Sequence, residues 1–270
     1  MAFSERLGAG ARGLPYFSCR FHAMAHRGAH IGPTAGQENT LAAFQAATDL
    51  GYRYIETDVQ ASRDGEAVLF HDDTLDRLTG TAGTVAERSA ASLKGLKVAG
   101  QPIPTLDAAL EEFPRARFNI DLKTFAAVEP LVRALARHKA GQRVLVDSFS
   151  QRRLSYFRTL TAGRVPTAAA PAGIAWTVFT PFLPALIASP GVALQIPLRQ
   201  RLGPLDLTVF SARLVANAHR AGRVVHVWTV DDAATMESLI AAGADGIITD
   251  RPDILKQVLQ RHDLWEASDE

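Results

Sequence analysis

The sequence predicts an α/β protein, a single-domain (β/α)8 TIM barrel, and two observations carry this prediction. Short apolar runs of strand length alternate with amphipathic helical segments along most of the 270-residue chain, and no hairpin signature joins them. Repeated strand–helix units imply a parallel sheet, and about eight units in a chain of this length fit a closed barrel. No Gly-rich dinucleotide fingerprint follows an early strand, which argues against an open doubly wound sheet.

Nine segments are candidates for the eight strand positions, so one of them is not expected in the barrel. The two weakest candidates are residues 165–170 and 192–196. Helical patterns lie between most of the segments, as in "NTLAAFQAATDLG", which has an Asn/Thr cap and stops at Gly51. The nine strand candidates are residues 21–26, 54–59, 67–71, 117–123, 143–149, 165–170, 192–196, 224–230 and 246–249.

Four segments depart from the barrel pattern of residues 21–260. Residues 1–20 are an N-terminal extension, and residues 261–270 are a polar tail. Residues 72–104 are polar and rich in Gly and Thr, and we expect a small insertion after the third strand, over the strand ends. Residues 165–198 carry no charged side chain and six prolines. They fit a buried strand with proline-rich loops, or an exposed apolar rim that contacts lipid or a partner at a membrane surface.

Composition narrows the class of protein. The formal net charge of +1, without any Lys/Arg run, gives no electrostatic reason to expect nucleic acid as a partner. The single cysteine, Cys19, fits a reducing compartment. No signal-peptide core and no apolar stretch of membrane-spanning length are present, so a cytoplasmic protein is expected. The oligomeric state stays open.

Acidic side chains recur on one face of two predicted strands. Because side chains alternate along a strand, Glu56 and Asp58 share a face in "YIETDV", and Asp121 and Lys123 share one in "RFNIDLK". Buried carboxylates are costly unless a cation meets them. Barrel enzymes assemble their sites at the C-terminal strand ends, so these three carboxylates are expected to form one cluster. Hard oxygen ligands without cysteine suit Mg²⁺ or Ca²⁺.

Two histidines fall where predicted strands end. His26 ends the first segment and His71 the third, so both are expected beside the carboxylate cluster. Two histidines that flank a metal can act as general base and general acid. A lone strand-end histidine is usually structural, but the convergence of six polar side chains favours chemistry. We expect His30 to be a solvated loop residue and His226 an internal barrel residue with a hydrogen-bond partner.

A series of motifs extends over residues 23–258. The motifs are "AHRG" (25–28), "ENT" (38–40), "YIETDVQASRDGEAVLFHD" (54–72), "IPTLDAAL" (103–110), "NIDLK" (119–123), "VWTVDD" (227–232) and "GADGIITDRPD" (243–253). In this order they resemble the glycerophosphodiester phosphodiesterases. These are metal-dependent (β/α)8 barrels that cleave glycerophosphodiesters to glycerol 3-phosphate and an alcohol.

The resemblance implies roles for the cluster. His26 and His71 stand in the places of the family's catalytic pair. Glu56 and Asp58 match two metal ligands, and Asp121 stands where a third is expected. The family commonly has Glu at this third place, and Asp121 is one methylene shorter, so the position or preference of the metal can differ.

Four further residues match family positions around the substrate. Arg27 and Lys123 resemble the cationic contacts to the phosphate. Trp228 is expected to line the pocket beside the glycerol or the leaving group, and Glu38 of the "ENT" motif to fix the first loop.

Three other functions stay open. A lysophospholipase D acting on lysolipids at a membrane is favoured by the charge-free residues 165–198. A phosphatidylinositol-type phospholipase C fits the "GIITDRP" ending less well. A non-catalytic phosphodiester-binding barrel would explain Asp121, but it has no need for both His26 and His71.

Overall fold

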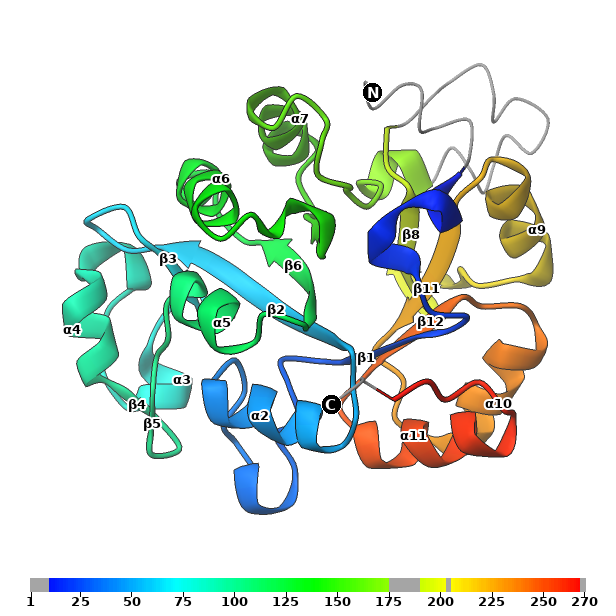
Figure 1. Cartoon of the computed structure of the whole chain (residues 1–270), viewed down its shortest axis with the longest axis horizontal. Helices are drawn as coiled ribbons and strands as arrows, with labels where there is room; N and C mark the ends of the chain where they lie inside the picture. The colour runs from blue at the N-terminus through cyan, green and yellow to red at the C-terminus, as the bar shows by residue number, and fades with distance from the viewer. Residues whose placement is uncertain (1–9, 175–189, 203–204, 268–270) are drawn as a thin grey trace.

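A curled parallel sheet is the centre of the computed structural model, which describes residues 10–174, 190–202 and 205–267 (Figure 1). The hydrogen-bonded strand order is β7-β6-β2-β1-β12-β11-β8. Every neighbouring pair along this path is parallel, as predicted. The strands are β1 (His22–Ala25), β2 (Tyr54–Ala61), β6 (Arg117–Leu122), β7 (Val144–Asp147), β8 (Ala193–Pro197), β11 (Val224–Trp228) and β12 (Gly246–Thr249).

Residues 167–168 complete the ring between β7 and β8. Thr167 forms a parallel bridge with Val146, and Ala168 forms one with Ala193. The Ala168 amide donates to Val146 at 2.9 Å, and the Ala169 amide donates to Ala193 at 2.8 Å. These residues therefore occupy the eighth barrel position, so the predicted segments 165–170 and 192–196 both contribute to the barrel.

The ninth candidate, residues 67–71, is the one outside the barrel. It forms β3 (Ala67–Leu69), which pairs antiparallel with β2. An Asp-Gly turn in "SRDGEA" joins the two strands, with Gly65 at φ 80° and the Ser62 amide donating to Glu66 at 3.0 Å. The expectation that no hairpin is present was wrong, because this turn signal sits inside what reads as one polar loop.

Helices cover the outside of the sheet (Figure 1). In α2 the Thr40 hydroxyl accepts from the Ala43 amide at 3.2 Å, and the helix ends before Gly51 at φ 88°, as the cap pattern predicts. Its Phe44 is buried against the barrel wall. The larger helices are α2 (Leu41–Asp49), α5 (Leu106–Glu112), α6 (Val128–Arg137), α7 (Gln151–Leu160), α9 (Ala212–Arg220), α10 (Ala233–Ala241) and α11 (Pro252–Arg261).

Residues 72–104 fold around a small apolar cluster of their own, beside β3. Leu75, Val85 and Leu93 are buried in this cluster together with Phe70. His71, which directly precedes the segment, is thus held between β3 and a packed cluster. Its elements are α3 (Asp76–Thr79), η5 (Val85–Glu87), α4 (Ala90–Gly95), β4 (Lys97–Val98) and β5 (Gln101–Pro102).

The residues before β1 pack into the N-terminal end of the barrel. They form η2 (Ala11–Gly13) and η3 (Pro15–Phe17), and Tyr16 and Phe17 are buried. The Tyr54 hydroxyl at the start of β2 donates to the Tyr16 carbonyl at 2.8 Å. Residues 10–20 therefore close the floor of the barrel, opposite the C-terminal strand ends.

Within the described ranges, no helix has the length and apolar character needed to cross a bilayer. Of the predicted apolar rim, residues 175–189 lie outside the described residues. In its described flanks Ala168 and Leu194 are buried in the barrel, whereas Pro171 and Pro190 are exposed.

Candidate active site

A pocket of about 180 Å³ lies at the C-terminal ends of the barrel strands. Of the nine predicted site residues, only Glu38 is not among those lining it. A larger cavity of about 390 Å³ beside α6 and α7 has no acidic or histidine side chain in its lining. The smaller pocket is lined by His26, Arg27, Glu56, Asp58, His71, Asn119, Asp121, Lys123, Asp147, Phe149, Gln195, Trp228, Thr229 and Ile248.

Asp58 is paired on both carboxylate oxygens. Lys123 Nζ lies 2.8 Å from Oδ1, and Arg27 Nε lies 3.2 Å from Oδ2. The Asn39 amide also donates to Oδ2 at 2.8 Å. Burial would raise the pKa of Asp58, but the Lys123 and Arg27 charges hold it below its usual value. Asp58 is thus a fixed anion that positions both cations.

Glu56 and Asp121 have less positive charge beside them than Asp58 has. Burial and the nearby Asp58 charge raise the pKa of Glu56 to about 7, and burial raises that of Asp121 despite its 2.7 Å contact with Lys123. The other oxygen of Asp121, Oδ1, is buried without a hydrogen-bond partner. Such an oxygen is unfavourable unless a cation or a donor reaches it.

A divalent cation fits this donor set. The pocket holds four carboxylates, those of Glu56, Asp58, Asp121 and Asp147, against the two cations Arg27 and Lys123. With all four ionised, the excess is two negative charges in a low-dielectric site, all on hard oxygen donors. Lys123 holds one oxygen of Asp58 and one of Asp121. In the described part of the chain no group of three His, Cys, Asp or Glu side chains is already assembled as a metal cluster.

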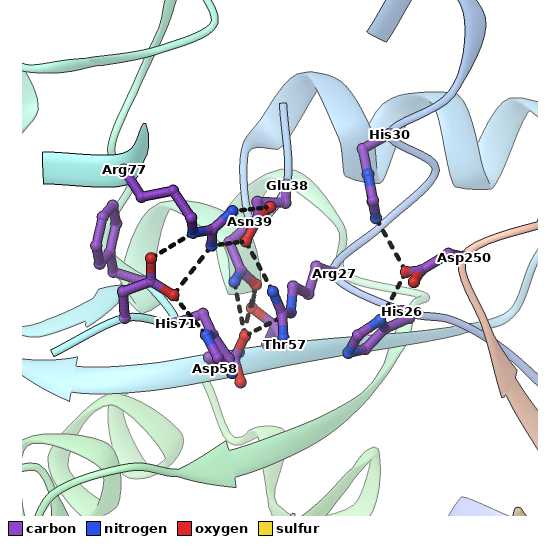
Figure 2. Close-up of polar contacts among 12 residues, drawn as sticks. His26, Arg27, His30, Glu38, Asn39, Thr57, Asp58, His71, Arg77 and Asp250 are labelled. Carbon is purple, nitrogen blue, oxygen red and sulfur yellow. Dashed lines mark hydrogen bonds and ion pairs between the residues drawn. The ribbon is translucent and has the colours of Figure 1, made fainter. Parts of the chain in front are cut away.

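His26 is oriented by an aspartate from the last strand end. Its Nδ1 lies 2.6 Å from Asp250 Oδ1 (Figure 2). Its Nε2 lies 3.8 Å from Glu56 Oε2. Burial lowers the pKa of His26, but Glu56 and Asp250 outweigh it, so the net pKa is raised. His30 binds the same Asp250 oxygen at 3.1 Å and is partly buried, so the prediction of a solvated loop histidine was wrong.

His71 has a matching arrangement on the other side of Asp58 (Figure 2). Its Nδ1 lies 2.7 Å from Asp72 Oδ1, and Arg77 holds Asp72 at 2.5 Å. An aspartate at Nδ1 fixes the tautomer of an imidazole and leaves Nε2 to exchange protons. Both histidines are therefore oriented through Nδ1, each by its own aspartate.

Glu38 links the first loop to residues 72–104. It accepts from Arg27 Nη1 at 2.8 Å and from two nitrogens of Arg77, at 2.8 and 3.0 Å (Figure 2). Burial would raise the pKa of Glu38, but Arg77 and Arg27 lower it. Charges of alternating sign thus run from Asp72 through Arg77, Glu38 and Arg27 to Asp58.

The turn after β1 places Arg27 by means of Gly28. Arg27 has φ 55° and Gly28 has φ 84°. The backbone amide of Asn39 donates to the Arg27 carbonyl at 3.0 Å. A Cβ at Gly28 would lie 2.8 Å from the backbone of Ala43 in α2. Only glycine lets the turn approach the helix this closely.

Sequence reasoning missed several residues of the site. Asp250 and Asp147 each stand at or directly after a strand end, the same signal that singled out His26. Asn39 lies within the "ENT" motif, where it accepts from the Thr57 hydroxyl at 2.7 Å. Asp72 also stands directly after a predicted strand end, at His71. Arg77 has no such signal, because its role depends on how residues 72–104 fold.

Known proteins resemble this chain over most of its length. The model of the Glycerophosphoryl diester phosphodiesterase family matches residues 26–254. The chain belongs to this family. It is 39% identical over 255 residues to "Probable glycerophosphodiester phosphodiesterase 2" of Mycobacterium tuberculosis, covering 91% of this chain and 93% of that protein.

Two further relatives match nearly the whole of this chain. The "Glycerophosphodiester phosphodiesterase" of Caldanaerobacter subterraneus subsp. tengcongensis is 30% identical, with 88% of this chain and 97% of that protein covered. A phosphodiesterase of Oleispira antarctica, solved with the product sn-glycerol-3-phosphate, superposes with a TM-score of 0.73 at 25% identity. That match covers 88% of this chain and 96% of the other. The family's barrel is thus present over nearly the whole chain.

Proposed function

We propose that this enzyme hydrolyses glycerophosphodiesters to glycerol 3-phosphate and an alcohol, with a divalent metal ion and with His26 and His71 as the acid–base pair. The observation that carries the proposal is that both histidines, each oriented by an aspartate, line one pocket with the carboxylate cluster. The names of the relatives and the product held by the Oleispira antarctica protein support the substrate class. A binding module would not need an oriented pair of this kind.

The metal would be held by Glu56, Asp58 and Asp121, with Mg²⁺ or Ca²⁺ suited to their oxygens. When bound it would neutralise charge on the phosphate and polarise its oxygens. Arg27 and Lys123 line the same pocket and carry positive charge within reach of the phosphate. They would stabilise the charge that spreads over the phosphoryl oxygens in the transition state.

The two histidines would move the protons. One Nε2 would take the proton of the attacking oxygen, which belongs to water or to a glycerol hydroxyl. As that oxygen bonds to phosphorus, the bond from phosphorus to the leaving alcohol oxygen breaks, and the other Nε2 gives a proton to the leaving oxygen. Attack by water yields glycerol 3-phosphate directly, whereas attack by the glycerol hydroxyl yields a cyclic phosphate that a water molecule then opens to glycerol 3-phosphate. The raised pKa of His26 keeps its imidazole basic, and it suits either role near neutral pH.

Aromatic side chains form the apolar wall of the pocket. Trp228 meets Phe149 edge-to-face, with 5.8 Å between ring centroids. Trp228 would pack against glycerol or the leaving group. Phe149, which lines the pocket, is 60% exposed. This exposed ring favours a second candidate substrate, a lysolipid whose alkyl chain would cover it.

The proposal is tested by glycerol 3-phosphate release from glycerophosphocholine, first with EDTA and then with added Mg²⁺, Mn²⁺ or Ca²⁺. Release that EDTA abolishes and metal restores is expected. Absence of release with every ion would contradict the substrate assignment. Turnover of lysophosphatidylcholine is measured in parallel, together with binding to liposomes by co-sedimentation. These two measurements decide between the two substrate classes.

A further inference from the structure

Asp147 sits beside Asp121 in the barrel interior. It ends β7 and is paired in register with Asp121 of the neighbouring β6. Side chains at paired positions of adjacent parallel strands point to the same face, about 5 Å apart. Both residues line the active-site pocket. The two carboxyl groups therefore project side by side into the same space.

Unlike Asp58, Asp147 has no cation of its own. Its Oδ1 accepts from the Ser148 amide at 2.7 Å. Across the described ranges, no Lys, Arg or His nitrogen lies within ion-pair distance of Asp147. A partly buried carboxylate without a counter-charge is destabilising. The fold keeps it in the lining of the pocket, where a ligand could supply the missing positive charge.

The neighbouring Asp121 supplies an independent sign of a missing ligand. Asp121 is 7% exposed, and its Oδ1 has no hydrogen-bond partner, while Lys123 holds Oδ2. An unsatisfied buried oxygen and an uncompensated carboxylate thus lie on adjacent strands at the same level. A hard divalent cation accepts oxygen ligands of this kind from more than one carboxylate.

We propose that Asp147 is a further direct ligand of the metal site, beside Glu56, Asp58 and Asp121. This inference rests on the metal dependence in the proposed function. It makes the centre a four-carboxylate site in which two short aspartates on adjacent strands share the cation. An aspartate side chain is one methylene shorter than a glutamate side chain. The carboxylate of Asp147 would make up for the short reach of Asp121.

The test is calorimetric titration of the purified protein with Mn²⁺ alone. Asp147→Asn keeps the size of the side chain but removes its charge, and we expect the Kd for Mn²⁺ to rise at least about ten-fold. Asp49→Asn, on the exposed end of α2, is the matched control and should bind as the wild type does. The thermal midpoint without metal should not fall in Asp147→Asn, because an uncompensated carboxylate is removed.

Each outcome separates the two proposals. A wild type that does not bind Mn²⁺ would overturn the metal dependence and this inference with it. Weakened binding in Asp121→Asn with unchanged binding in Asp147→Asn would overturn the inference alone. Asp147→Ser must weaken binding as well. A lowered metal-free thermal midpoint in both Asp147 variants would indicate a structural role instead and contradict the assignment.

Discussion

His26 Nδ1 lies 2.6 Å from Asp250 Oδ1, and the same oxygen lies 3.1 Å from His30 Nε2. One carboxylate from the end of β12 thus orients the histidine that follows β1. This contact fixes which nitrogen of His26 faces the pocket at the C-terminal strand ends. The activity of His26 should therefore depend on a residue that need not touch the substrate.

Replacing Asp250 tests this dependence. Glu56 and Asp250 both raise the pKa of His26, and Asp250→Asn removes the second of these charges, so the limb of the pH–rate profile that reports His26 should move to lower pH. The kcat should fall about ten-fold or more, because general acid–base catalysis supplies about 10² to 10⁴ and depends on orientation. The measurement is kcat against pH for the wild type and the variant.

His30→Gln is the control for that experiment, since it leaves Asp250 in place. Its profile should follow that of the wild type. An Asp250→Asn enzyme whose pH profile is unmoved would show that the carboxylate does not set the state of His26.

Gly28 should tolerate no side chain. Gly28→Ala places a Cβ 2.8 Å from the Ala43 backbone at φ 84°, so the free energy of unfolding should fall by about 1–3 kcal/mol. Gly80→Ala is the matched control, because Gly80 has φ 65° with open space around its Cβ position. Urea unfolding of both variants checks this, and equal losses would exclude the steric contribution.

Because of the buried pair His22 and His226, the free energy of unfolding should decline in mild acid. His22 Nδ1 lies 3.1 Å from His226 Nε2, and burial lowers the pKa of His22 to about 4. Between pH of about 6.5 and about 4, the unfolded chain binds a proton at His22 that the folded chain does not, so folded-state stability falls as pH falls.

A variant isolates this contribution from other titrating groups. The stability difference between wild type and His22→Gln should shrink when urea unfolding is repeated at about pH 5 instead of about pH 7.5. A difference that is the same at both pH values would contradict the neutral buried state of His22.

Periodicity predicted much of the site. Glu56 and Asp58 point into the barrel as strand alternation requires, and Asp58 is in register with Asp121. His226 is fully buried, and Gln195 and His22 contact its ring nitrogens, which confirms its prediction as an internal residue. These features follow from the two-residue repeat of a strand, which is local in the sequence.

The rest depends on distant contacts. Asp250 meets His26 across 224 positions, and no repeat pattern predicts such a pairing. The misjudged segment 67–71 has the apolar character of a barrel strand, and only its Asp-Gly turn distinguishes it. Residues 10–20 read as an extension, although Tyr16 and Phe17 fill the barrel floor.

The central claim is that His26 and His71 exchange protons across the pocket. The most direct test is kcat of metal-saturated His26→Ala and His71→Ala on two substrates, glycerophosphocholine and a glycerophosphoryl nitrophenyl ester. Both variants should lose about 10² to 10⁴-fold on the choline ester. The leaving group of the nitrophenyl ester needs no proton. The kcat of the variant that lacks the general acid should therefore recover on this ester, whereas the kcat of the variant that lacks the general base should stay low. Near-normal turnover of the choline ester by either folded variant would contradict the account.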